Sequence, residues 1–160
     1  MLAAAGVLAL ASCGDDDGEE AGSQPAARDT VPADTQPAKP EPKGTAITVR
    51  ESEFGPMLFD SRRQAIYIFE NDPKGETVCY DECAEAWPPV YTKGEPKASG
   101  GVRQSLLGTV ERRDGRRQVT YAGKPLYFYA HEGPGEVRCH NVDLNGGLWW
   151  VVGPGGKRRP

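Results

Sequence analysis

The chain contains an internal repeat, which restricts the folds that it can adopt. When the sequence is shifted by 60 residues, one block aligns with another without gaps. A β unit of this size is too small to close a hydrophobic core alone, so the two copies are expected to pack face to face around a pseudo-twofold axis. The aligned pairs are Ile66 with Leu126, Tyr67 with Tyr127, Phe69 with Tyr129, Asp72 with Glu132, Gly75-Glu76 with Gly135-Glu136, and Cys79 with Cys139.

Residues 45–160 carry short apolar runs separated by turn residues. An Asp114-Gly115 pair between two such runs is a strong hairpin signal. Tyr80–Trp87 is rich in Ala and Glu and predicts a short helix that ends at Pro88-Pro89. The expected fold is therefore mostly β, with two homologous antiparallel β units and one short helix. The expected strands are 46–50, 57–60, 65–69, 106–111, 118–121, 125–130 and 148–152, and the repeats cover about 46–91 and 106–152.

Aromatic residues fall at alternate positions of the repeated strand. Tyr67 and Phe69 should share one face of it, as should their equivalents Tyr127 and Tyr129. The adjacent pair at 149–150 differs, because only one of two neighbouring tryptophans on a strand can face a given core. The other is expected to be exposed, or to cover part of a groove.

The N-terminus predicts export and lipid attachment. Residues 2–10 form an apolar run of the length of a signal-peptide core, too short to span a membrane. The run ends in Leu10-Ala11-Ser12-Cys13, which resembles the lipobox of bacterial lipoproteins. The resemblance implies a signal peptide at 1–12 and a diacylglycerol on Cys13. The protein is thus expected on the extracytoplasmic face of a cell membrane.

Residues 13–44 are predicted to be a tether. From residue 14 to 44 the chain has eight acidic and three basic residues, five prolines and almost nothing large and apolar. Such a segment cannot bury enough surface to offset its ordering entropy, so we expect it to be disordered. The remaining domain has 16 basic and 15 acidic residues. Neither part has the basic excess of a nucleic-acid binder, so we expect no nucleic-acid partner.

The stretch from Leu58 to Lys157 resembles the secreted-repeat lipoproteins of unknown function, which carry a Tyr-x-aromatic-x-x-Asp motif in tandem copies. The resemblance implies a secreted or lipid-anchored location and no established activity. In the second copy Glu132 stands where the motif has Asp. The segments that carry the resemblance are Tyr67-Ile68-Phe69-Glu70-Asn71-Asp72, Cys79-Tyr80-Asp81-Glu82-Cys83 with Trp87-Pro88-Pro89, the link at 118–127, and residues 146–152.

Three cysteines remain in the domain once Cys13 is lipidated. Outside the membrane, thiols tend to be oxidised, so one disulfide and one odd thiol are expected. The family resemblance implies a Cys79–Cys83 bond. The repeat symmetry offers a rival, since equivalent positions of two packed copies can meet and would give Cys79–Cys139. Connectivity cannot be read from spacing alone.

Two interpretations of the motif residues stay open. They could hold a ligand between aromatic faces and a carboxylate. Alternatively, the aromatic residues are core, and Asp72 accepts hydrogen bonds from the backbone of the following turn. The candidate ligand residues are Tyr67, Phe69, Asp72, Tyr127, Tyr129, Glu132 and Trp149.

A redox or metal site is the alternative function. Cys79, Cys83, Cys139 and His140 have the thiolate and imidazole groups that suit zinc, copper or haem iron. A neighbouring imidazolium would lower the pKa of the Cys139 thiol. No haem-attachment motif or common zinc-knuckle spacing occurs, so no cofactor is expected.

The sequence favours a non-enzymatic binding module over an enzyme. It has no nucleophile elbow, phosphate-binding glycine loop or His-Glu-x-x-His helix. The expected partners are the membrane, through the lipid on Cys13, and an envelope partner or small ligand whose identity the sequence does not give.

The lipobox generates the first testable prediction. Full-length protein with its native start should incorporate labelled palmitate and partition into detergent, because Cys13 supplies the thiol that takes the lipid. The substitution Cys13→Ala should abolish both. A variant that labels as strongly as wild type would contradict the assignment of the lipobox.

Overall fold

A computed structural model describes residues 43–160, which form a predominantly β structure. The strands are short, and β4 and β8 have two residues each. The elements are β1 (Ala46–Arg50), β2 (Met57–Asp60), β3 (Tyr67–Phe69), α1 (Glu82–Ala86), β4 (Tyr91–Thr92), β5 (Lys97–Ser99), the 3-10 turn η1 (Gln104–Leu106), β6 (Leu107–Glu111), β7 (Arg117–Tyr121), β8 (Lys124–Pro125), β9 (Val142–Leu144) and β10 (Gly147–Val151).

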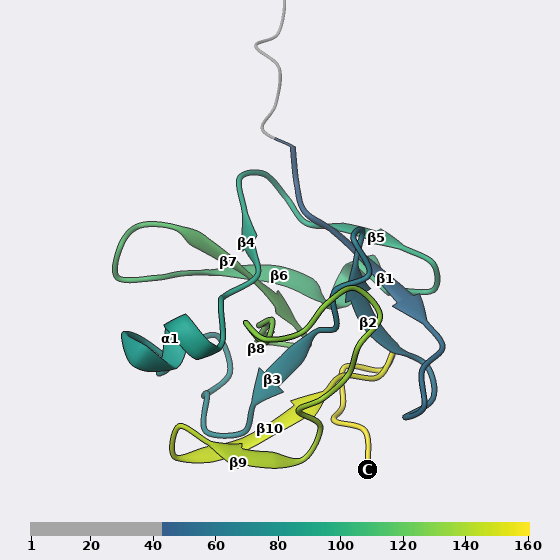
Figure 1. The fold of residues 1–160 in the computed structure, drawn as a ribbon. Helices are drawn as coiled ribbons and strands as arrows, with labels where there is room; N and C mark the ends of the chain where they lie inside the picture. The colour runs from purple at the N-terminus through teal and green to yellow at the C-terminus, as the bar shows by residue number, and fades with distance from the viewer. Residues whose placement is uncertain (1–42) are drawn as a thin grey trace, which may run out of the picture. The chain divides into compact units, whose positions relative to one another are not determined.

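The strands form three small sheets (Figure 1). Each has a central strand: β1 lies between β2 and β5, β10 between β3 and β9, and β7 between β4 and β6. β8 also pairs with β7. Every pair of strands is antiparallel except β1 with β5, which is parallel. The predicted mostly β fold with one short helix is confirmed.

The chain turns back after β2, and the hairpin expected at Asp114-Gly115 also forms. The Asp60 N–H donates to the Gln64 carbonyl at 3.0 Å, and Phe59 bridges to Ala65, so the chain turns back after β2. β6 and β7 pair across the Asp114-Gly115 turn, where Gly115 has a φ of 75°. The predicted strand at 125–130 is shorter than expected, since only β8 and single bridges at Tyr127 pair there. β4, β5 and β9 were not predicted.

The helix lies within the predicted segment 80–87. α1 ends where Trp87 N–H donates to the Cys83 carbonyl at 2.8 Å. Pro88 and Pro89 follow and offer no N–H for another turn. The chain then runs straight into β4. Because the prolines end the helix, Trp87 lies at the junction between α1 and the segment that leads to β4.

The two copies meet at Tyr67 and Tyr127. The backbone N–H of each donates to the carbonyl of the other, both at 2.9 Å. Because these residues are repeat equivalents, the pseudo-twofold axis passes between them. A second pair of bonds obeys the same symmetry: Gly75 N–H to the Gly123 carbonyl, and Gly135 N–H to the Arg63 carbonyl, both 2.7 Å.

Alternation along the strands divides the interior into two hydrophobic clusters. Tyr67, Phe69 and Tyr127 lie in the first cluster, with Tyr129 packed against it, as their spacing predicted. Side chains at the intervening positions lie in the second cluster. The first contains Met57, Phe59, Ala65, Cys79, Trp87, Cys139, Trp149 and Val151 besides, and the second contains Ile47, Leu58, Ile66, Ile68, Val90, Val119, Tyr121, Leu126, Trp150 and Val152.

The expectation that one tryptophan of the pair at 149–150 is exposed is wrong. Trp149 lies in the first cluster with 0% exposure, and Trp150 lies in the second with 8%. Both are buried because β10 is a central strand with a hydrophobic cluster on each face. Trp150 does form part of the wall of a surface hollow, together with Ile68 and Arg158.

A stack of four aromatic rings lies at the centre of the first cluster. The Trp87 and Trp149 rings are parallel within 2°, with centroids 3.8 Å apart. Phe69 stacks on the outer face of Trp149 at 4.5 Å, and Tyr129 lies against Trp87 at 4.8 Å. Phe69 and Tyr129 are repeat equivalents, so the stack itself follows the pseudo-twofold symmetry. Trp87 and Trp149 occupy matching places in the stack, although their separation in the sequence differs slightly from 60 residues.

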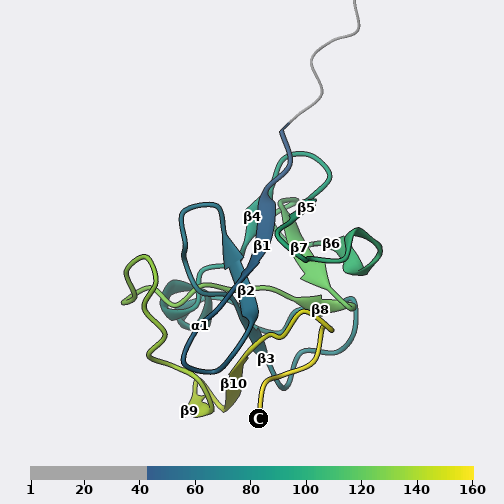
Figure 2. The same cartoon turned by 90° about the vertical axis from the view of Figure 1, so that its right-hand side faces the viewer.

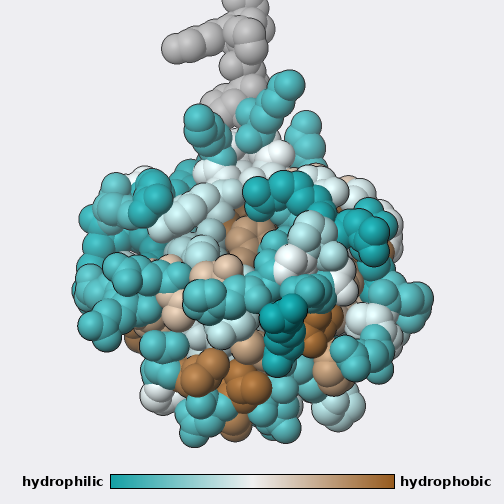
Figure 3. Space-filling view, in the orientation of Figure 1, coloured by the Kyte–Doolittle hydropathy of each residue, from teal (hydrophilic) through white to brown (hydrophobic). Residues whose placement is uncertain are grey.

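The ends of the described chain lie far apart. Residue 43 and the C-terminus lie at opposite ends of the domain in both views (Figure 1, Figure 2). The face shown in Figure 3 is mainly hydrophilic, with small separate apolar patches towards β9 and β10. No helix within residues 43–160 is long and apolar enough to cross a membrane. The expected signal peptide, Cys13 and the tether up to residue 42 lie outside the described residues.

The aromatic stack generates a prediction about stability. Trp87→Ala and Trp149→Ala should each lower the free energy of unfolding by about 3–5 kcal/mol, because each leaves a large cavity in a fully buried site. Their effects should not add, since the rings are in contact. Urea unfolding of the two single variants and the double variant measures this.

The matched control is Leu144→Ala, which truncates a side chain that is 40% exposed. It should cost under about 1 kcal/mol. If either tryptophan variant is no less stable than this control, the stack is not the centre of the core.

Candidate functional site

The repeated motif places two tyrosine–carboxylate pairs in the interior. The Tyr67 hydroxyl donates to Glu132 Oε1 at 2.6 Å, and the Tyr127 hydroxyl donates to Asp72 Oδ2 at 2.7 Å. Each tyrosine therefore bonds the carboxylate of the other copy. The sequence pattern identified the tyrosines and the carboxylates. It did not predict that each tyrosine would bond the carboxylate of the other copy.

Each carboxylate also organises the turn that follows it. Asp72 Oδ1 accepts the Val78 N–H at 2.8 Å, and Glu132 Oε1 accepts the N–H of Arg138, the repeat equivalent of Val78. Asp72 is 2% exposed and Glu132 is 8% exposed. The motif thus positions a buried polar contact between the copies, and Asp72 accepts a backbone hydrogen bond from the turn that follows it.

A buried arginine completes the Asp72–Tyr127 pair. Arg112 is 4% exposed and donates to Gln118 Oε1 at 2.7 Å and to the Cys79 carbonyl at 2.6 Å. It also donates to Thr77 Oγ1 at 3.2 Å, and that hydroxyl lies 2.6 Å from the Tyr127 hydroxyl. Two hydroxyls therefore connect the Asp72 carboxylate to a buried guanidinium.

The Glu132–Tyr67 pair has no such completion. Val137 occupies the position equivalent to Thr77 and has no hydroxyl to offer. Glu132 Oε2 is the one buried side-chain polar atom among residues 43–160 that has no hydrogen-bond partner. The longer side chain of Glu132 thus keeps the tyrosine contact and leaves its second oxygen unpaired.

Burial controls the protonation of these pairs. Loss of solvation raises the pKa of both the Asp72 and the Glu132 carboxyl, although hydrogen bonds from Tyr127 and Tyr67 oppose the shift. Burial also raises the pKa of Tyr67 and Tyr127, with the neighbouring carboxylates adding to the shift. The tyrosines therefore remain hydrogen-bond donors at any physiological pH.

The cysteines form the disulfide that the family resemblance implied. Cys79 and Cys83 are bonded, with 2.02 Å between the sulfur atoms and 5.3 Å between the Cα atoms. The rival Cys79–Cys139 bond is wrong, because Cys139 is a free thiol buried in the first hydrophobic cluster. Cys79 and Cys139 are repeat equivalents on opposite sides of the symmetry axis. Cys79 forms a disulfide, whereas Cys139 is a free thiol.

The expected activation of Cys139 by His140 is also wrong. Burial, followed by the nearby Glu132 charge, raises the pKa of the Cys139 thiol. The His140 ring instead packs 4.3 Å from the Phe54 ring, and its Nε2 lies 3.3 Å from the Pro160 carbonyl. Sequence adjacency therefore does not make His140 a cause of the shift in the pKa of the Cys139 thiol.

The alternative metal site is not assembled in the described part of the chain. Within residues 43–160 no three His, Cys, Asp or Glu side chains are grouped so that they could hold a metal ion. Cys79 and Cys83 are bonded to each other, and Cys139 lies in the other copy. The four residues proposed from the sequence therefore do not form one ligand set.

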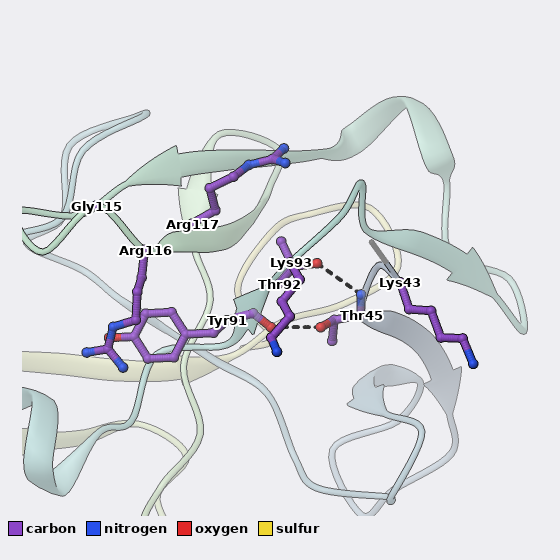
Figure 4. A pocket seen from close by; sticks show the side chains of 8 residues that line it. All are labelled: Lys43, Thr45, Tyr91, Thr92, Lys93, Gly115, Arg116 and Arg117. Atoms are coloured by element: carbon purple, nitrogen blue, oxygen red, sulfur yellow. Dashed lines mark hydrogen bonds between the residues drawn. The ribbon is translucent and has the colours of Figure 1, made fainter. Parts of the chain in front are cut away.

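A surface hollow of about 700 Å³ lies between β4 and the start of β7 (Figure 4). Its charged residues are all basic. Two of them, Lys43 and Lys93, are exposed and form no salt bridge among the described residues. The lining consists of Lys43, Thr45, Tyr91, Thr92, Lys93, Gly115, Arg116 and Arg117.

The arginines of this basic hollow are partly neutralised. Arg116 pairs with Asp114 at 2.6 Å and lies over the Tyr91 ring, 4.1 Å from its centroid. Arg117 pairs with Glu95. Four cations against two paired carboxylates leave the hollow with a net charge of +2.

The basic hollow was not predicted from the sequence. Its lysines and arginines come from three separate segments, and only the fold brings them together. The one available signal was the group Arg112-Arg113 and Arg116-Arg117 around the hairpin turn. Arg112 is buried, so this group alone would have misplaced the charge.

The sequence model of a family described as a secreted repeat of unknown function matches residues 48–91 and 108–153. The chain belongs to this family. The two matches fall on the two copies that meet at Tyr67 and Tyr127. Membership of the secreted-repeat family places the protein outside the cytoplasm, in the envelope or beyond it. No curated protein and no solved structure matches the chain.

The raised pKa values of Asp72 and Glu132 predict a pH dependence of stability. The folded state holds these protons more tightly than the unfolded chain. The resulting stabilisation is fullest below the ordinary carboxyl pKa of about 4 and is lost as the pH rises through the raised values. Wild-type stability minus that of D72N/E132Q should therefore fall between about pH 4 and pH 7 in urea unfolding.

The control for this experiment is Asp143→Asn, which removes an exposed carboxylate on β9. The stability difference between wild type and this variant should change little over the same range. A difference between wild type and D72N/E132Q that grows with pH would contradict the prediction.

Proposed function

We propose that the protein is a non-enzymatic binding module, anchored by a lipid on Cys13 at the extracytoplasmic face of the membrane, and that the basic hollow binds an anionic ligand. The observation that carries this proposal is the hollow itself, whose lining includes four basic and no acidic residues. Its volume falls within the usual range for ligand sites, about 300–1,000 Å³.

The lipid anchor is supported by sequence and family together. Leu10-Ala11-Ser12-Cys13 has the arrangement of a lipobox. The secreted-repeat family supplies the extracytoplasmic location that a lipobox requires. The anchor would keep the domain close to the membrane that bears it.

The non-enzymatic role is supported by the burial of the most chemically distinctive groups. Asp72, Glu132 and Cys139 are all under 9% exposed. The two carboxyls are committed to tyrosine contacts that join the copies. These groups act on the stability of the fold and are not exposed to a ligand.

Binding of a soluble polyanion tests the proposal. Isothermal titration calorimetry of the full chain with sodium polyphosphate should show binding that weakens as salt is added, because exposed charges are screened. Lys43→Glu together with Lys93→Glu should weaken binding about tenfold or more, since two attractions become repulsions.

The matched control is Lys74→Glu together with Lys157→Glu. These lysines are also exposed and line a different hollow, so the control makes the same change in net charge elsewhere. It should retain most of the affinity. If both double variants lose the same affinity for polyphosphate, the loss comes from the change in net charge, and the proposed site is wrong.

A further inference from the structure

The basic hollow lies at the end of the domain where the chain comes from Cys13. Lys43 is the first described residue, and it lines the hollow. The C-terminus lies at the opposite end of the domain (Figure 1, Figure 2). If Cys13 carries the lipid, the basic hollow lies at the end of the domain that is nearest the anchor in sequence.

The hollow lacks the fixed polar groups that orient a small molecule. The Thr45 hydroxyl donates to the Tyr91 carbonyl at 2.7 Å, and the Thr92 hydroxyl donates to the Gly94 carbonyl at 2.7 Å. Both hydroxyls therefore donate their hydrogen bonds to backbone carbonyls and not to a ligand. What remains unpaired for a ligand is the positive charge of Lys43 and Lys93, whose flexible side chains recognise an anion as point charges.

The charged ends are also spread out. In Figure 4 the terminal nitrogen atoms of Lys43, Lys93, Arg116 and Arg117 lie apart around the hollow and do not converge on one point. A single small anion would reach one or two of them at a time. An array of phosphates spaced over a surface can meet all of them.

We infer that the basic hollow binds the phosphate headgroups of anionic lipids in the membrane that holds the anchor. This inference rests on the proposed function and names its ligand. The contact holds the anchored domain against the leaflet with the hollow facing the lipid. Each cation next to an anionic bilayer strengthens partitioning roughly fivefold, so two lysines account for roughly 25-fold.

Vesicle cosedimentation tests the inference. The full chain carries Cys13→Ala, so that no lipid is attached and every variant shares the same N-terminus. The vesicles are phosphatidylcholine alone, or an equal mixture of phosphatidylcholine and phosphatidylglycerol. The protein should bind the mixed vesicles more tightly than the neutral ones, and K43E/K93E should lower binding to the mixed vesicles by roughly 25-fold or more.

The control K74E/K157E should keep most of the preference for mixed vesicles, and K43Q/K93Q should give an intermediate loss. Unchanged urea midpoints show that each variant is folded. Equal losses in K43E/K93E and K74E/K157E would overturn the inference, and so would equal binding of wild-type side chains to neutral and mixed vesicles.

Different results would contradict the proposed binding of an anionic ligand and the inferred binding of lipid headgroups. If the protein binds polyphosphate through Lys43 and Lys93 but shows no preference for phosphatidylglycerol, the proposed function stands and the headgroup inference is wrong. If polyphosphate does not bind, the proposed function is wrong. Binding of the mixed vesicles that is lost only in the variants of the hollow supports both.

Discussion

The exchange of hydrogen bonds between the two copies is the constraint on which the fold depends. Tyr67 and Tyr127 pair through their backbones at the symmetry axis, and each sends its hydroxyl to the carboxylate of the opposite copy. Those carboxylates in turn hold the turns that lead to the cysteine positions. If one copy were absent, the other would retain a buried carboxylate without its tyrosine, and leaving a buried polar group unpaired is costly. The aromatic stack of Trp87 and Trp149 adds apolar burial to the same junction.

The copies share a backbone plan but have diverged in their polar chemistry. The first copy holds the carboxylate that is connected, through Tyr127 and then Thr77, to the buried Arg112 of the second copy. It also fixes its cysteine in a disulfide. The second copy has Val137, a free Cys139 and an unpaired oxygen on Glu132. The Asp72 pair is thus fully hydrogen-bonded and its copy contains the disulfide, whereas the Glu132 pair keeps its tyrosine contact and leaves one carboxylate oxygen unpaired.

The fold was predictable from the sequence to the extent that it depends on periodicity and local turn chemistry. The repeat offset, the alternation at Tyr67 and Phe69, and the Asp114-Gly115 turn led to the strands at those positions and to the two-copy arrangement. Prediction failed where long-range packing decides. Trp150 is buried because a second cluster covers the other face of β10, which no local pattern reveals. The basic hollow escaped notice because Lys43, Lys93 and Arg117 come together only in the folded chain.

The crossed tyrosine–carboxylate contacts also bear on how such a chain can arise. A polypeptide with a single copy could satisfy the same contacts only by associating with a second identical polypeptide, because each tyrosine reaches a carboxylate outside its own copy. Joining two copies in one chain turns that association into an intramolecular one and removes its dependence on concentration. Fusion also frees the two halves from being identical. Substitutions such as Thr77 in one half and Val137 in the other can then accumulate independently, which a symmetric dimer of one gene product does not permit.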